Sequence, residues 1–269
     1  MTLLVLLSLQ CLAMRPTQGG LWSFDSTDDV VHHDEATGLV RVHYSIDGPN
    51  RVRQGDGNAN DLPDFVEDVG DTSVEVLDFY SQSLGLRLPI SEAEMGLGNL
   101  GGSEAFDFYL IDFAGNADGL FGIDACTTIP RHCSGYMVME NDFSGYGYPT
   151  TDMAISVLTS HELFHAVQAA YDSEQESWFS EGTAVWGEKQ FDPDSLDFLW
   201  FAAAYLEDTG RTLNRPPTGP IPTFSYSTAL WWDFLRLRHD AEFMVDLLEA
   251  TETLDGKAVD TLAEMEILL

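Results

Sequence analysis

The chain has 269 residues, 44% of them hydrophobic, which is enough to bury the core of one good-sized domain or of two small lobes packed together. Its 45 acidic residues far outnumber its 12 basic ones, and the formal net charge is −33 at pH 7. Such a surface repels phosphate backbones and anionic lipids, which argues against nucleic acids and membrane surfaces as partners.

The N-terminal residues 1–13 form an apolar run that predicts the core of a signal peptide. This run is too short to cross a bilayer as a helix. We therefore expect residues 1–18 to be a signal peptide and the mature chain to be secreted, with no membrane contact. No Lys or Arg precedes the run, and Cys11 leaves lipid anchoring open as an alternative.

The first half of the chain predicts strands around one helix. Alternating polarity predicts strands at 39–44, 105–113 and 135–140. From residue 64 to 84 the apolar residues recur at helical spacing, and Gly85 predicts the end of that helix. The stretch 114–134 is rich in turn residues.

Cys126 and Cys133 are the only cysteines beyond the expected signal peptide. Two cysteines seven apart in an exported chain predict a local disulfide loop. The alternative is a pair of free buried thiols. A zinc site is disfavoured because His132, beside Cys133, has no fourth partner nearby.

The second half of the chain predicts helices. The first is capped by Thr150 or Thr151 and runs to about residue 171, and others follow from 177–180, over 194–208 and over 226–238. A Pro/Gly-rich linker occupies 215–222, and one or two short helices finish the chain. Strands followed by helices predict an α+β fold. We expect a single domain over 19–269, with a sheet-and-helix lobe at 19–172 and a helical lobe at 173–269.

His161, Glu162 and His165 form an H-E-x-x-H motif within the first of these helices. Side chains four residues apart lie on one helix face, so two imidazoles can reach one ion, and zinc favours such nitrogen ligands. Glu162 is placed to take a proton from a water molecule at the metal. The motif predicts a zinc-dependent hydrolase.

The third ligand decides the subtype. Metzincins continue with Gly and His where this chain has Gln168 and Tyr171, so that subtype fails. The segment WFSEGTA at 178–184 resembles the W-x-x-E-G-x-A segment of the M1-type gluzincin peptidases, and this resemblance implies that Glu181 is the third zinc ligand. Only fifteen residues separate His165 from Glu181, fewer than in well-known gluzincins, so Glu188 stays open as an alternative.

Two further resemblances extend beyond the metal motif. The segment FSYSTAL at 224–230 resembles the tyrosine-led helix of M1-type enzymes, which implies that Tyr226 stabilises the oxyanion; a plain structural tyrosine is the alternative. The order of motifs over roughly 40–240, including FDFYLIDF and HExxHAVQAAYD, is similar to a bacterial family of secreted proteins assigned as metalloproteases. Both resemblances imply a zincin-like fold with the active-site cleft between the two lobes.

An acidic loop over 56–67 has the oxygen-ligand pattern of an EF-hand calcium loop. Asp61 stands where that pattern has Gly, and would need a left-handed backbone. Pro63 makes a thrombospondin-type calcium turn an equal alternative, and a solvated acidic turn is the simplest one. The expected calcium ligands are Asp56, Asn58, Asn60, the carbonyl of Leu62, Asp64 and Glu67.

Together these features predict a secreted zinc peptidase that acts on peptides or proteins with Glu162 as general base. The substrate would pair with the strand at 105–113 or at 135–140. A catalytically silent zinc-containing binding module and a zinc hydrolase of non-peptide substrates stay open as alternatives. Cleavage preference and oligomeric state are not encoded in any recognisable motif.

Overall fold

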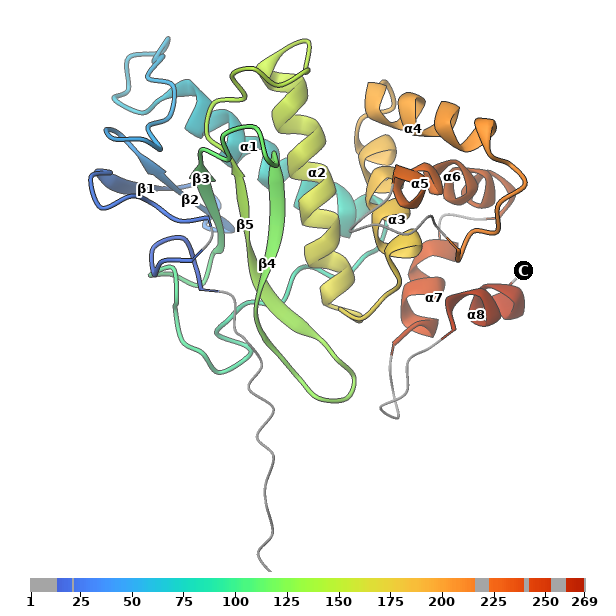
Figure 1. The fold of residues 1–269 in the computed structure, drawn as a ribbon. Coiled ribbons are helices and arrows are strands. Elements are labelled where there is room, and N and C mark those ends of the chain that lie inside the picture. The colour runs from blue at the N-terminus through green and yellow to red at the C-terminus, as the bar shows by residue number, and fades with distance from the viewer. Residues whose placement is uncertain (1–13, 21, 216–222, 240–241, 253–259, 269) are drawn as a thin grey trace, which may run out of the picture.

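The computed structural model describes residues 14–20, 22–215, 223–239, 242–252 and 260–268. A five-stranded mixed sheet lies on one side, and helices fill the other (Figure 1). The fold is therefore α+β, as expected. No helix within the described ranges is both long enough and apolar enough to cross a membrane.

The sheet has the order β1-β2-β3-β5-β4. Its two central pairings, β2 with β3 and β3 with β5, are parallel, whereas both outer strands pair antiparallel to their neighbours. The strands are β1 (Val30–Asp34), β2 (Val40–Ser45), β3 (Phe106–Ile111), β4 (Gly119–Cys126) and β5 (Cys133–Glu140).

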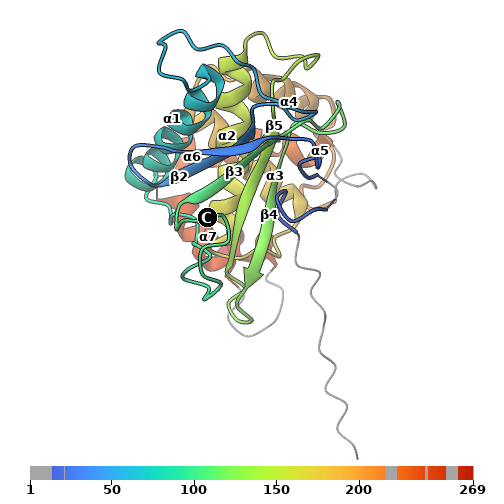
Figure 2. The same ribbon diagram turned by 90° about the vertical axis from the view of Figure 1, so that its left-hand side faces the viewer.

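The helices fall into two groups. Helices α1 (Asp64–Asp78), with its π-helical extension η1 (Phe79–Ser83), and α2 (Thr151–Ala169) lie against the sheet, and Figure 2 shows them behind the strands. The rest form the helical side: α3 (Ser177–Phe191), α4 (Leu196–Glu207), α5 (Thr223–Ser227), α6 (Ala229–Arg238), α7 (Phe243–Ala250) and α8 (Thr261–Leu268). The expected linker at 215–222 lies almost entirely outside the described residues.

Alternation along the central strands gives the sheet two buried faces. Phe108 and Met137 point into the main core with α1 and α2, whereas Tyr109 and Val138 point into a smaller cluster on the opposite face. The segment after residue 14 closes that second face, where Trp22 packs against the cluster. Central strands buried on both faces are typical of parallel pairing.

The N-terminal segment brings a buried charge into this second face. Arg15 is only 1% exposed, and its guanidinium forms ion pairs with Asp107, Asp124 and Glu92. It also donates a hydrogen bond to Tyr109. A signal peptide ending at residue 18 would contain this arginine, and its removal would break these ion pairs; the boundary stays a prediction. The apolar residues 1–13 lie outside the described part of the chain.

Strand β4 lies in the stretch expected to be turns, so that expectation is wrong. The strand pairs antiparallel with β5, and Cys126 and Cys133 face each other at the hairpin end in a disulfide. The expected disulfide is thus confirmed. Gly119 and Gly122 interrupt the alternation of polar and apolar residues along β4. The sequence of this segment therefore did not predict a strand.

Candidate metal centre

Helix α2 carries the first two side chains of the site. Thr150 caps this helix, because its hydroxyl accepts a hydrogen bond from the N–H of Met153. The helix is buried on most sides, between β4, β5, α1 and α3, so its polar side chains face the interior. His161 is buried and His165, one turn later, is half-buried on the same face.

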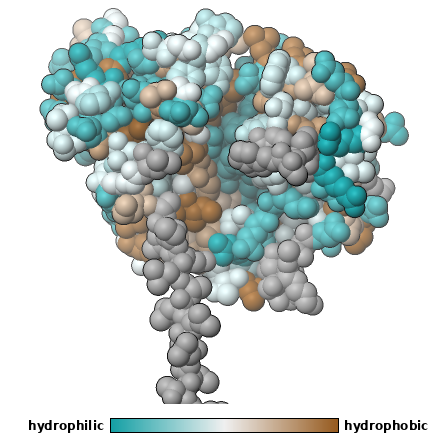
Figure 3. Space-filling view, in the orientation of Figure 1, coloured by the Kyte–Doolittle hydropathy of each residue, from teal (hydrophilic) through white to brown (hydrophobic). Residues whose placement is uncertain are grey.

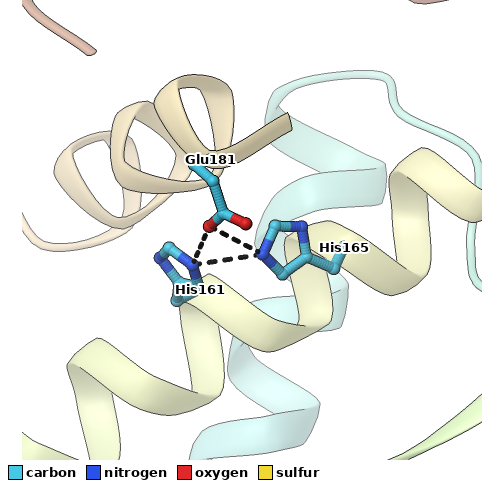
Figure 4. A group of neighbouring side chains, drawn as sticks. All are labelled: His161, His165 and Glu181. Atoms are coloured by element: carbon cyan, nitrogen blue, oxygen red, sulfur yellow. Dashed lines mark hydrogen bonds and ion pairs between the residues drawn. The ribbon is translucent and has the colours of Figure 1, made fainter. Parts of the chain in front are cut away.

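Helix α3 brings the third side chain. Glu181 Oε2 lies 3.3 Å from His161 Nε2 and 3.4 Å from His165 Nε2, and the two ring nitrogens lie 3.2 Å apart (Figure 4). Among the described residues, this is the one group of three or more His, Cys, Asp or Glu side chains whose ligand atoms gather closely enough to hold a metal ion. The structure thus brings together His161, His165 and Glu181, as expected.

The far side of each imidazole is held by a partner. Glu188 Oε1 lies 2.5 Å from His161 Nδ1, and Gln168 Oε1 lies 2.8 Å from His165 Nδ1. The amide nitrogen of Gln168 donates to the carbonyl of Ser180, which fixes its oxygen toward His165. Because both Nδ1 atoms face acceptors, each neutral ring carries its proton there and presents an Nε2 lone pair.

Three electron-pair donors, two Nε2 atoms and one carboxylate oxygen, therefore converge on one point. Without a cation between them these lone pairs repel, so the arrangement fits a metal ion with nitrogen and oxygen ligands. Protons are the competitors: burial would lower the pKa of His161 and His165, but hydrogen bonds to Glu181 outweigh it and raise both pKa values. Burial raises the pKa of Glu181, but its bonds to the two histidines lower it overall.

The roles of Glu188 and Gln168 are the part of the site that the sequence predicted least well. Glu188 was the alternative third ligand, but it lies on the opposite nitrogen of His161 and does not belong to the converging group. Gln168 stands where the metzincins have Gly, and its role as a partner of His165 could not be inferred from spacing. The available sequence signal was a single polar residue within the otherwise apolar stretch 166–170.

We expect Glu188→Gln to lower the affinity of this group for a divalent metal ion by about 10–100-fold, because it weakens the bond that fixes the proton and orientation of His161. The dissociation constant, measured by competition with a chromogenic chelator, checks this. The control is Glu207→Gln at the exposed end of α4. An unchanged affinity in Glu188→Gln would show that the ring is oriented without this carboxylate.

Gly182 lets α3 pack closely against the turn between α5 and α6, next to Glu181. A Cβ there would lie 1.8 Å from Thr228 Oγ1, which is held by hydrogen bonds to the carbonyls of Trp178 and Ser225. We therefore expect Gly182→Ala to destabilise the fold by roughly 1–3 kcal/mol, although Ala is the better helix former. Urea unfolding measures this. Gly210→Ala, with nothing within 4 Å of its Cβ, is the control, and equal midpoints would refute the clash.

A cavity of about 330 Å³ opens beside the metal group. Its walls come from β4, α2 and α3, and Glu162 lies on the wall together with Gly119 and Phe121. The surface is hollowed between the sheet side and the helical side, and hydrophilic residues gather there (Figure 3). Glu162 is 7% exposed, and burial raises its pKa.

Tyr226 on α5 reaches the same place. Its ring stacks on that of His161, with centroids 5.9 Å apart, and it lines the cavity beside Glu162. Burial, followed by the charges of Glu181 and Glu162, raises the pKa of its hydroxyl, which therefore stays protonated. The structure thus puts Tyr226 at the metal group; its catalytic role stays a prediction.

The acidic loop lies elsewhere, before α1. Asp61 has φ +67°, so the left-handed backbone expected at this position is confirmed. A helix follows the loop but none precedes it within the described residues 46–63. The loop is closed by its own hydrogen bonds: Asp56 accepts from the N–H groups of Asn60 and Asp61, and the amide groups of Asn58 and Asn60 donate to Glu67.

Two side-chain oxygens among the expected ligands also accept hydrogen bonds within the loop. Asp64 accepts from the N–H of Gly57, and Asn60 Oδ1 accepts from the N–H of Leu62. The carboxylates of Asp56, Asp64 and Glu67 are not among the closely gathered ligand groups found in the described residues. Calcium binding stays a prediction.

Comparison with known proteins does not assign the chain to a family. No protein-family model matches the chain, and no curated protein is significantly similar to it. The case for a function therefore rests on the geometry of the site.

Proposed function

We propose that the chain is a secreted zinc-dependent peptidase of the gluzincin type. The observation that supports this most directly is the convergence of two histidine Nε2 lone pairs and one Glu181 oxygen, with a carboxylate, Glu162, beside them. Two histidines and one glutamate form a three-ligand set typical of catalytic zinc, which leaves a fourth position for water or substrate. His161, His165 and Glu181 would hold the ion.

The chemistry divides between the ion and the chain. Bound zinc supplies Lewis acidity, which lowers the pKa of a water molecule and polarises a scissile carbonyl. Glu162 takes a proton from the attacking water and passes it to the leaving nitrogen, so that the peptide bond breaks and a neutral amine departs. The Tyr226 hydroxyl donates a hydrogen bond to the carbonyl oxygen as negative charge develops there.

The peptide would lie along β4. The strands at 106–111 and 133–140 have neighbours on both sides, so neither can pair with a substrate, and the earlier suggestion of those strands is wrong. Strand β4 is at the edge of the sheet, and Gly119, Leu120 and Phe121 of this strand line the cavity beside Glu162. An extended peptide added to this edge would pass over the metal group.

Metal content and casein cleavage of the purified protein, with and without 1,10-phenanthroline, test the proposal. One zinc per chain and cleavage blocked by this chelator, but not by a non-chelating phenanthroline isomer, are the expected results. Zinc with hydrolysis of model esters but of no peptide would indicate a non-peptide hydrolase. Zinc with no hydrolysis would favour a binding module, and absence of zinc binding would refute the proposal.

A further inference from the structure

A second cavity, of about 250 Å³, meets the metal group from the side of α4. It shares four lining residues with the first cavity: Gly119, His161, Glu162 and Tyr226. A peptide bound in the first cavity therefore reaches the second one at the point where its bond would be cleaved. The second cavity is therefore placed to receive the side chain of a substrate residue next to that bond.

The walls of this second cavity are acidic at one end and apolar along the sides. Besides Glu162, three carboxylates line it, from Asp118, Glu188 and Asp197, and no Lys or Arg does. Lys189 follows Glu188 in α3, but its ammonium bonds the carbonyl of Pro193 instead. The apolar side chains that line it are Val157, Leu158 and Phe201, together with the rings of Tyr148 and Tyr226, and the hydroxyl of Tyr148 donates a hydrogen bond to Asp118.

Two of these carboxylates can accept further hydrogen bonds. Glu188 is 2% exposed, and although Oε1 bonds His161, its buried Oε2 has no hydrogen-bond partner among the described residues. The carboxylate of Asp197 forms no hydrogen bond or ion pair within the same part of the chain. A buried acceptor without a donor is costly, so Glu188 Oε2 favours a donor from outside the chain, and the half-buried Asp197 adds a second acceptor in the same cavity.

Two features indicate which donor fits. The carboxylate oxygens of this cavity do not gather closely enough to form a metal site in the described residues, which suits a larger organic cation with several N–H groups better than a bare ion. The volume also exceeds what an isolated ammonium needs, since one water fills roughly 10–15 Å³. An aliphatic stem along apolar walls would occupy the remaining space.

We propose that this cavity binds the side chain of a Lys or Arg residue that adjoins the scissile bond, which makes the protein a peptidase selective for basic residues. The inference rests on the proposed peptidase function. Leu158 and Phe201 contact the stem, while Asp197 and Glu188 accept hydrogen bonds from the cationic head. Burial, and then the charge of Asp118, raise the pKa of Asp197, and a bound cation relieves that repulsion.

Matched peptides test the assignment. The substrates are N-acetylated, internally quenched peptides that share one sequence. They differ only at one of the two residues that flank the cleaved bond, which is Lys, norleucine or Glu. Their kcat/KM values are compared. In the wild type we expect the lysine peptide to be preferred. Asp197→Asn should lower the Lys-to-norleucine ratio by about tenfold, and Asp197→Lys should make the glutamate peptide the better substrate.

The control is Asp194→Asn, an exposed residue just before α4, which should leave the ratio unchanged. Asp197 also lies in the first turn of α4, where it favours the helix electrostatically, but that role would not move a ratio between two substrates. Equal ratios in wild type and Asp197→Asn would overturn the assignment while leaving the peptidase function intact. Cleavage of peptides only when their N-terminal amine is free would overturn it too, in favour of an amine site.

If no peptide is cleaved, the peptidase proposal fails and the cavity is tested by binding. Fluorescence anisotropy then compares the labelled lysine and norleucine peptides with wild type and Asp197→Asn. Tighter binding of the lysine peptide, lost in Asp197→Asn, would support the cavity as a site for cationic side chains. Equal binding of the two peptides would refute it.

Discussion

Glu162→Gln should lower kcat for peptide hydrolysis by about 10²–10⁴-fold while the zinc content stays the same. Glutamine keeps the shape of the side chain but cannot accept the proton of the attacking water. Glu162 does not belong to the converging group of His161, His165 and Glu181, so metal binding does not depend on it. Its burial beside the cavity and its raised pKa are what a proton acceptor at this position requires.

Two measurements on the same preparations decide the role of Glu162. Zinc is quantified by elemental analysis, and steady-state kinetics are recorded with a peptide that the wild type cleaves. Glu207→Gln, at an exposed position, serves as the control and should match the wild type in both. Joint loss of zinc and activity in Glu162→Gln would assign this residue a structural role, and full activity would exclude it as the base.

Arg15→Met should destabilise the fold by about 3–5 kcal/mol, the largest stability effect that we expect from a single substitution. Arg15 bonds Asp124 through Nε and Nη2, and its other terminal nitrogen bonds Asp107. Methionine fills much of the space but leaves Asp124 and Glu92 without a positive partner, and it leaves Asp107 with only the imidazole of His43. Within the described residues no other Lys or Arg forms an ion pair with these three carboxylates.

Urea unfolding of Arg15→Met and of Arg51→Met gives the comparison, since Arg51 is exposed. We expect the control to unfold within about 0.5 kcal/mol of the wild type. A chain that starts at residue 19 should lose at least as much stability as Arg15→Met, because it lacks the same guanidinium. Full stability of that shortened chain would show that residues 14–18 are not needed for folding and would be compatible with a signal peptide that ends at residue 18.

The sequence predicted the features that depend on the spacing of residues within a single helix or strand. His161 and His165 lie four apart, so a helix alone puts both rings on one face. The helical segment that ends before Gly85, made of α1 and η1, and the cap at Thr150 likewise follow from local backbone chemistry, and the structure has both. The α+β class followed from the order of strands and helices.

What the sequence could not predict depends on how elements pack. Glu188 holds His161 only because α3 crosses α2 at that point, and Asp118 and Asp197 share a cavity only because the start of β4 faces α4. Strand β4 was missed because its glycines break the alternation. Arg15 was missed because it adjoins an apolar run typical of a signal peptide.

The disulfide between Cys126 and Cys133 ties the far end of the β4–β5 hairpin, and β4 is also the wall along which a peptide would bind. The metal group belongs to α2 and α3, which contain no cysteine. Reduction of this disulfide would therefore leave the proposed metal ligands in place, whereas the edge of the groove would lose its covalent link. If the proposed peptidase function holds, reduction should raise KM for a peptide more than it lowers kcat or metal affinity, and a thiol-rich compartment would be the least favourable surroundings for activity.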